Sequence, residues 1–233
     1  MKNTIYKYRG IFDKTFERDI NSILENNFWS ANPIEFNDVF ETVIDNRPVI
    51  KLIEFIARWF GINSEKDIDF LNKNTDKVMS IDNRNGMYSL SKNSIDELLW
   101  AHYANQHNGY CIEYDLNILL NSIKEIEHYS SVTYSKTPLV INWKDFFSSN
   151  SKRLNKMGFN KSKRWEYEQE YRLITNTIGK INYSPLAIKS IYFGLRICSD
   201  KKQEIINSLK SKNIKFYQIE KIPKTYKLKA TLI

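Results

Sequence analysis

One stretch constrains the fold more than any other part of the chain, namely KSKRWEYEQEYRLI at residues 161–174. Its charged residues recur at every second position from Glu166 to Arg172, and the run ends in Leu-Ile-Thr. A period of two predicts a strand rather than a helix. The interleaved aromatic residues do not all fall on the opposite face, so we expect a bend or bulge near Gln169.

The carboxylates of this stretch need compensation, because acidic groups that share one strand face repel each other. Lys161 and Arg172 flank Glu168 and Glu170 and can supply the opposite charge. Two interpretations stay open. The stretch is either an exposed strand edge with mixed charges or a catalytic or ligand-binding strand.

Composition is typical of a folded protein, with 42% hydrophobic and 14% aromatic residues among 233. Only 7 Gly and 5 Pro argue against a loop-rich all-β sandwich. No signal peptide or apolar run of membrane-spanning length is evident, and the two cysteines form no motif. We therefore expect a cytoplasmic protein that does not enter a membrane, folded as one domain over residues 1–233.

Periodicity and capping signals predict an α+β fold, with a mixed or antiparallel central sheet and flanking helices. Strands are expected at 5–9, 28–31, 87–91, 110–115, 130–134, 171–175, 188–193, 215–219 and 226–232. Helices are expected at 16–27, 48–60, 64–74, 94–106, 116–126, 143–158 and 200–211, with Ser94 and Asp200 as caps. The apolar residues of 48–60 predict a well-buried helix, and 48–76 is interpreted as a helical insertion or a lid.

Charge is distributed unevenly along the chain. Residues 151–233 carry 19 basic and 6 acidic residues, a net charge of +13, while the first 150 residues carry −5. A basic half predicts an anionic partner, either a nucleotide or a nucleic acid. The competing interpretation is that surface lysines only keep the protein in solution.

Several segments carry a resemblance to a known family. They are YKYR, FWSANPIEFNDVFE, YSLS, LLWAHYANQHNGYCIEYD, KSKRWEYEQEYRLI and SIYFGLRI. In this order the chain resembles a bacterial family called domain of unknown function 2971. Val39 departs from the family pattern, which usually shows Pro there. The resemblance implies a soluble bacterial protein but no particular activity.

A second resemblance concerns mechanism. ADP-ribosyltransferases of the toxin type place a basic residue, a Ser-x-Ser and a Glu-x-Glu on successive strands of a split sheet. The same order is found here in Arg9 (or Lys7), then Ser89 and Ser91, then Glu168 and Glu170. The resemblance implies an enzyme that uses NAD as its substrate, either an ADP-ribosyltransferase or an NAD glycohydrolase, in a toxin or phage-defence system.

That resemblance also implies roles for individual residues. Glu170 would be the catalytic residue, Glu168 its helper, Ser89 its support and Arg9 the phosphate clamp. Tyr8 or Tyr103 would stack on the nicotinamide ring. The residue types suit the reaction, because a fixed carboxylate stabilises the positive charge that develops on the ribose, and arginine pairs with a diphosphate through parallel N–H donors.

Two other functions are compatible with the sequence. A metal-dependent nuclease would gather Mg²⁺ on Asp38, Glu41, Glu168 and Glu170, with Lys161 or Lys163 holding the phosphate. A non-catalytic module of a defence system would bind a nucleic acid or a protein and use Trp100, Trp165 and Tyr167 as stacking platforms.

The remaining candidates are polar residues between aromatic ones. Asn37, Asp38 and Glu41 form either an Asx-turn or part of a site. His102 is a candidate for the wall of a pocket. His102 and His107 are five residues apart and do not face one metal, so no tightly bound metal is predicted.

Overall fold

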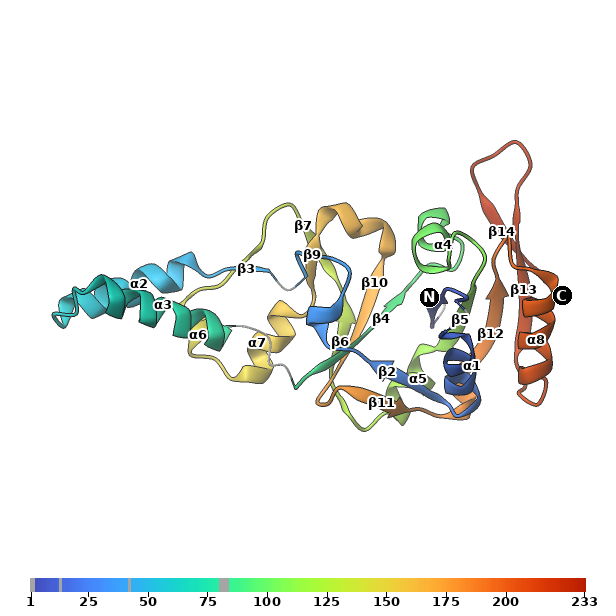
Figure 1. Ribbon diagram of the computed structural model, residues 1–233, viewed down its shortest axis with the longest axis horizontal. Coiled ribbons are helices and arrows are strands. Elements are labelled where there is room, and N and C mark those ends of the chain that lie inside the picture. Colours follow the sequence, from blue (N-terminus) through green and yellow to red (C-terminus); the bar gives the residue numbers. More distant parts are fainter. Residues whose placement is uncertain (1–2, 13, 42, 80–83) are drawn as a thin grey trace.

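The computed structural model describes residues 3–12, 14–41, 43–79 and 84–233 (Figure 1). Its main feature is an eight-stranded sheet in which only β12 and β13 run parallel. The predicted α+β class with a mixed central sheet is confirmed. In spatial order the strands are β14 (Leu228–Leu232), β13 (Lys215–Lys221), β12 (Ile188–Phe193), β5 (Tyr110–Asp115), β1 (Thr4–Arg9), β4 (Gly86–Ser91), β10 (Glu170–Thr175) and β6 (Ile126–Ser131).

This sheet opens between β1 and β4. All six residues of β1 pair with β5, and all six residues of β4 pair with β10. Between β1 and β4, however, the single pair is Tyr6 with Ser91. From this pair toward Arg9 in β1 and Gly86 in β4, the two strands therefore move apart. Their facing edges line a space there and do not pair as a ladder.

Helices cover both faces of the sheet. On one face the core includes residues of α1 (Phe16–Leu24), α5 (Leu116–Ser122) and α8 (Ser199–Leu209). A smaller core contains Leu99 and Trp100 of α4 (Glu97–Tyr103), which pack with Tyr6 and Tyr8 of β1. The alternation of side chains along β1 thus buries its tyrosines under α4 and leaves Lys7 and Arg9 for the other face.

The other elements form small additions around the sheet. The short strands are β2 (Asn27–Ser30), β3 (Ile44–Asp45), β7 (Thr133–Ser135), β8 (Leu139–Val140), β9 (Asn160–Ser162) and β11 (Gly179–Asn182), which pair as β2 with β11, β3 with β8 and β7 with β9. The short helices are α6 (Trp143–Phe146), α7 (Asn150–Met157) and the 3₁₀ helices η1 (Pro33–Glu35), η2 (Lys163–Glu168) and η3 (Pro185–Ala187).

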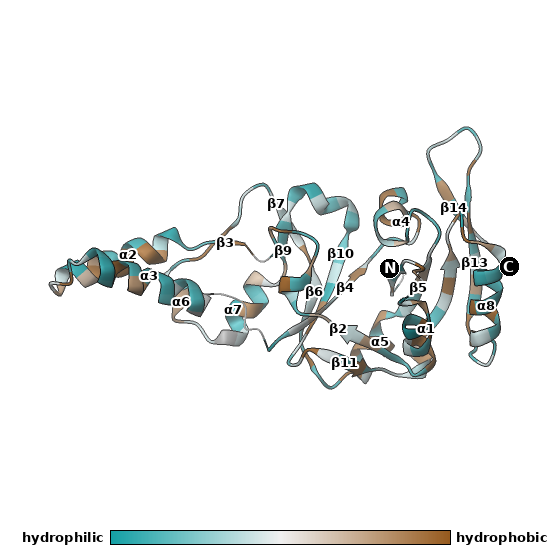
Figure 2. Ribbon diagram, in the orientation of Figure 1, coloured by the Kyte–Doolittle hydropathy of each residue, from teal (hydrophilic) through white to brown (hydrophobic). Residues whose placement is uncertain are grey.

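Helices α2 (Arg47–Trp59) and α3 (Glu65–Met79) project together as an arm (Figure 1). The prediction of a well-buried helix at 48–60 is wrong. Only Val49 and Ala57 of α2 are buried, whereas Trp59 is 78% and Phe60 77% exposed. Apolar and polar residues alternate along the arm (Figure 2). An insertion or a lid stays a prediction for this segment.

The predicted strand is also wrong over residues 163–168. β9 ends at Ser162, η2 follows, and β10 begins at Glu170. The expected irregularity near Gln169 is present, because that residue has φ of 44°, in the left-handed region. Glu166 and Glu168 of this stretch therefore lie on a 3₁₀ turn, while Glu170 and Arg172 lie on β10 and pair with each other.

Several helix limits differ from the prediction. The N-cap of α4 is Asp96 and not Ser94. Asp96 Oδ1 accepts from the backbone N–H groups of Leu98 and Leu99. Cys198 and not Asp200 precedes α8. The basic helix expected at 143–158 is two helices, α6 and α7. Among the described helices, none combines the length and the apolar character needed to cross a membrane.

Candidate functional site

A cavity of about 990 Å³ lies where β1 and β4 diverge. We call it the split cavity. Strands β1, β4 and β2, helix α1 and the start of β10 provide its walls, together with η1 and part of α4. Among the predicted site residues it is lined by Lys7, Tyr8, Arg9, Asn37, Ser89, Ser91, Tyr103, Lys161, Glu168 and Glu170. The topology thus brings together the three segments on which the mechanistic resemblance rests.

The two glutamates belong to consecutive secondary-structure elements. Glu168 is the last residue of η2, Glu170 is the first residue of β10, and both are 4% exposed. Ser91 Oγ donates to the Glu168 carbonyl at 2.7 Å, which fixes the turn to β4. The Glu170 backbone N–H donates to Tyr134 Oη at 2.7 Å, which fixes the beginning of β10.

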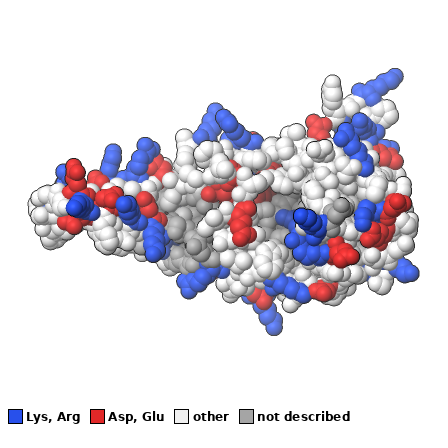
Figure 3. All heavy atoms as spheres, in the orientation of Figure 1, with Lys and Arg blue, Asp and Glu red and all other residues white. Residues whose placement is uncertain are grey.

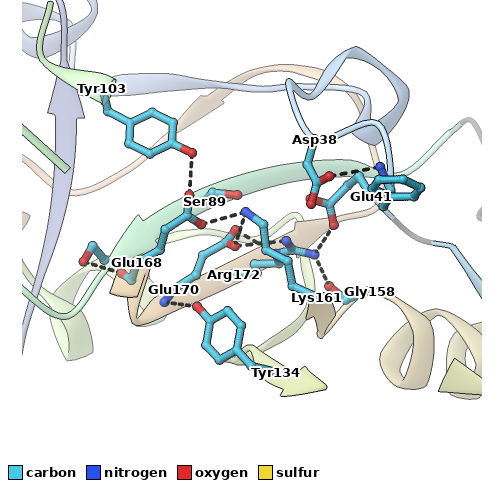
Figure 4. Close-up of polar contacts among 12 residues, drawn as sticks. Asp38, Glu41, Ser89, Tyr103, Tyr134, Gly158, Lys161, Glu168, Glu170 and Arg172 are labelled. Carbon is cyan, nitrogen blue, oxygen red and sulfur yellow. Dashed lines mark hydrogen bonds and ion pairs between the residues drawn. The ribbon is translucent and has the colours of Figure 1, made fainter. Parts of the chain in front are cut away.

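Both carboxylates are held by charged or polar partners (Figure 4). Glu170 accepts from Arg172 Nε at 2.7 Å and Arg172 Nη2 at 3.0 Å, and lies 3.2 Å from Lys161 Nζ. Glu168 accepts from Tyr103 Oη at 2.5 Å and from Lys161 Nζ at 2.6 Å. The interpretation of this stretch as an exposed strand edge is wrong for both glutamates.

Arg172 organises the deeper part of this network. It is fully buried, donates to the Gly158 carbonyl at 2.8 Å, and pairs with Glu41 at 2.7 Å as well as with Glu170. A guanidinium that binds two carboxylates and one carbonyl is satisfied on all sides. Arg172 and Glu41 therefore position Glu170 and do not line the split cavity themselves.

The neighbours of Glu170 decide its charge. Burial alone would raise the pKa of Glu170, but Arg172 and then Lys161 lower the pKa to about 2. Burial and the nearby charge of Glu168 raise the pKa of Tyr103 above its ordinary value. At neutral pH the site therefore presents an ionised Glu170 beside a neutral phenol.

Strand β1 contributes two basic residues, Lys7 and Arg9, to the cavity wall. Lys7 Nζ donates to the Ser89 carbonyl across the opening at 2.7 Å and lies 4.7 Å from the ring centroid of Tyr88. Burial, together with the charge of Arg9, lowers the pKa of Lys7 to about 7. Ser89 lines the cavity, its Oγ is buried, and its side chain also helps to lower the pKa of Glu170.

Some predicted site residues lie elsewhere. Trp100 is 0% exposed in the core under α4, and its Nε1 donates to the Ser94 carbonyl, so it is no stacking platform. His102 is exposed and does not line the cavity. Tyr8 lines the cavity, is 7% exposed and packs edge-on against Trp100, and its role in stacking on nicotinamide stays a prediction. The assignments of Trp100 and His102 are wrong in those roles.

Residues 37–40 and Trp165 border a second cavity of about 700 Å³, which shares Asn37 and Lys161 with the first. The predicted Asx-turn is present, since Asp38 Oδ1 accepts from the Phe40 backbone N–H at 3.0 Å. Lys161 is not an exposed phosphate ligand, because its ammonium group is 6% exposed and paired with both glutamates.

Sequence reasoning missed Tyr88 and Tyr134, which contact Lys7 and the Glu170 backbone. Tyr88 could have been found as the neighbour of Ser89 on one strand. Tyr134 could not, because only the pairing of β7 with β9 brings it to Glu170. In the part of the chain that the structure describes, no three His, Cys, Asp or Glu side chains gather as a metal site. Three of the four carboxylates of the nuclease hypothesis, Glu41, Glu168 and Glu170, instead pair with Lys161 or Arg172.

Comparison with known proteins gives one match. Residues 99–173, about a third of the chain, match the family described as Protein of unknown function (DUF2971). The resemblance found in the sequence is thus confirmed over a segment that holds Tyr103, Lys161, Glu168, Glu170 and Arg172. No curated protein and no solved structure matches the chain.

Proposed function

We propose that the protein is an NAD-using enzyme that breaks the bond between nicotinamide and ribose, as an ADP-ribosyltransferase or an NAD glycohydrolase. One observation carries the proposal. Arg9, Ser89, Glu168 and Glu170, which lie far apart in sequence, line a single cavity where the sheet splits. The cavity volume of about 990 Å³ is at the upper end of the usual range for ligand pockets and suits a dinucleotide.

Glu170 suits the electrostatic part of this reaction. Nicotinamide leaves C1′ of the ribose with the bonding electron pair, and the sugar carries positive charge until water or another acceptor adds to C1′ and loses a proton. A carboxylate stabilises that charge only if it is ionised and fixed. Glu170 meets both conditions, because its pKa is about 2 and Arg172 holds both of its oxygens.

The other lining groups suit the rest of the substrate. Arg9, with Lys7 beside it, places positive charge where a diphosphate requires it. Ser89, on the wall of the cavity beside Glu170, offers a hydroxyl group that supports Glu170 and accepts from a ribose hydroxyl. Tyr103, which is half-buried and donates to Glu168, is the tyrosine placed to pack on nicotinamide, in preference to Tyr8.

Within this proposal the enzyme acts in the cytoplasm as an effector of a toxin or phage-defence system. The acceptor of ADP-ribose is a protein or a nucleic acid if the reaction is a transfer. On the face shown in Figure 3, Lys and Arg are interspersed with Asp and Glu, so this face gives no support to a nucleic-acid partner.

The test follows nicotinamide release from NAD⁺ by chromatography. We expect release by the wild-type chain, and a decrease of about 10²-fold or more in Glu168→Gln and in Glu170→Gln, the range seen when one electrostatic group is removed from an active site. Glu166→Gln is the matched control, because Glu166 belongs to the same turn but pairs with Lys163 at the surface. It should leave the rate unchanged.

Stability must be measured alongside activity, because Glu170→Gln leaves Arg172 short of one anion. Removing one member of a buried ion pair costs about 3–5 kcal/mol. Rates are therefore compared below the thermal midpoint of each variant. Absence of release by the folded wild-type chain, with and without candidate acceptors, would refute the proposal.

A further inference from the structure

The second cavity, which we call the Asp38 cavity, is lined by an aspartate of which one buried oxygen has no hydrogen-bond partner among the described residues. It lies between residues 37–40 with Val43 on one side and the segments around 135–139 and 160–167 on the other. Asp38 is only 6% exposed, and Asp38 Oδ1 accepts from the Phe40 N–H at 3.0 Å. Asp38 Oδ2 is buried and makes no hydrogen bond with any described residue.

An unsatisfied buried carboxylate oxygen is costly. Leaving a buried charged group without its hydrogen bond costs more than the roughly 1–3 kcal/mol typical of neutral groups. The backbone turn needs only Oδ1, so the turn does not explain why Oδ2 is buried without a partner among the described residues. The missing partner has to be a hydrogen-bond donor, and a positively charged donor offsets the most desolvation.

The cations that line this cavity do not supply that donor. Lys161 Nζ is committed to Glu168 at 2.6 Å and to Glu170 at 3.2 Å. Lys136 and Arg164 are exposed at the rim, where water and salt screen their charge. Next to Asp38, Glu41 belongs to the same turn, since its N–H donates to the Asp38 carbonyl at 2.9 Å, and it pairs with Arg172.

Aromatic side chains form another part of the wall. Trp165 and Tyr167 lie with ring centroids 6.1 Å apart, and Phe40 is 68% exposed. The Trp165 ring already accepts a cation, because Lys161 Nζ lies 4.9 Å from its centroid. Aromatic walls beside one buried carboxylate are suited to an organic cation, which needs apolar contact for its carbon atoms and one anion for its N–H group.

We propose that the Asp38 cavity binds an organic cation that carries an N–H donor, an alkylammonium or an alkylguanidinium group. The N–H donates to Asp38 Oδ2, and the alkyl and cationic parts pack on the aromatic wall. This binding does not depend on the reaction proposed for the split cavity. Asn37 and Lys161 line both cavities, and Lys161 pairs with Glu168 and Glu170. The Asp38 cavity is lined by no residue of β1, so the bound cation does not contact that strand.

The experiment titrates the full chain with butylguanidinium, butylammonium and tetramethylammonium, followed by tryptophan fluorescence and by calorimetry. The first two should bind, and tetramethylammonium should bind about tenfold more weakly or not at all, because it has charge but no N–H donor. Two further ligands then distinguish the possible sources of the cationic group. Agmatine represents a small free amine, and an acetylated arginine amide represents an arginine side chain of a protein. Binding of either supports the proposal.

Asp38→Asn is the variant to use, because an asparagine Oδ1 still accepts from the Phe40 N–H while the charge is lost. We expect about a tenfold or greater loss of affinity for butylguanidinium. The thermal midpoint without ligand should be equal or higher, since no buried charge is left unpaired. Asp69→Asn is the control, because Asp69 pairs with Lys73 on the exposed arm.

Two results would overturn the proposal. One is failure of the wild-type chain to bind either N–H cation. The other is binding that is equally strong for tetramethylammonium or in Asp38→Asn. The ligand series on the wild-type chain keeps the proposal testable even if a variant does not fold.

Discussion

Lys7 is the residue whose charge the fold controls most directly. A lysine is ordinarily protonated up to about pH 10, but burial and Arg9 lower the pKa of Lys7 to about 7. Its ammonium group spans the opening of the sheet by donating to the Ser89 carbonyl. The cavity therefore gains or loses one positive charge near neutral pH.

The first prediction concerns ligand binding as a function of pH. Affinity for ADP-ribose, whose diphosphate keeps its charge near neutrality, should fall as pH rises from about 6 to about 8, because Lys7 loses its proton through a pKa of about 7. In Lys7→Met the affinity should be lower at pH 6 and nearly independent of pH. Calorimetry measures both, and the exposed Lys163→Met serves as control.

The same shift has a consequence for stability, with a definite sign. Between pH 7 and about pH 10 the unfolded chain binds the Lys7 proton and the folded chain does not, so this residue makes the free energy of unfolding increase with pH in that window. Thermal midpoints of the wild-type chain relative to Lys7→Met should rise between about pH 7 and pH 10. A flat difference would show that Lys7 titrates normally.

At the scale of elements, the junction between η2 and β10 sets the position of both glutamates. Gln169 adopts φ of 44° there, and a left-handed conformation costs about 1–2 kcal/mol for a residue other than glycine. Lys92 N–H donates to the Gln169 carbonyl at 3.1 Å and Ser91 Oγ to the Glu168 carbonyl, so β4 holds the strained turn in place.

The prediction for this element uses two substitutions at one site. Gln169→Gly should leave the free energy of unfolding within about 1 kcal/mol of the wild-type value, since glycine adopts positive φ freely. Gln169→Val should lower it by about 1–2 kcal/mol, because a β-branched residue fits that region worst. Chemical denaturation measures both values. Equal stability of the two variants would mean that the turn is not left-handed.

The elements also show what a sequence can predict. Alternation and apolar runs predicted most strands of the sheet, because a buried strand imposes its period locally. The same rule failed at 163–168, where charge alternation comes from pairing of Lys163 with Glu166 and of Lys161 with Glu168 in a 3₁₀ turn. It also failed for α2, because its apolar residues lie on an arm that the sheet does not cover.

At the scale of the whole molecule, the order of the strands creates the split cavity. β1 pairs fully with β5, β4 pairs fully with β10, and a single residue pair joins the two halves. Resemblance predicted which residues would meet there, but not how they are held. The links among Glu41, Arg172, Gly158 and Tyr134 depend on tertiary contacts that no local pattern reveals.

The arrangement of cavities also operates at this scale. The split cavity and the Asp38 cavity share Lys161 and Asn37, and Lys161 is paired with Glu168. In our two proposals, the split cavity binds an anion and the neighbouring Asp38 cavity binds a cation. The arm of α2 and α3 lies away from the sheet and lines neither cavity.

The central claim is that Arg9 and the glutamates act on one diphosphate-containing ligand at the split of the sheet. The most direct measurement is the affinity of wild-type and Arg9→Gln protein for ADP-ribose, with adenosine as a ligand that lacks the diphosphate. We predict that Arg9→Gln weakens ADP-ribose binding by about tenfold or more and leaves adenosine binding unchanged. Equal ADP-ribose affinity in both folded proteins, or no binding by the wild-type chain, would contradict the account.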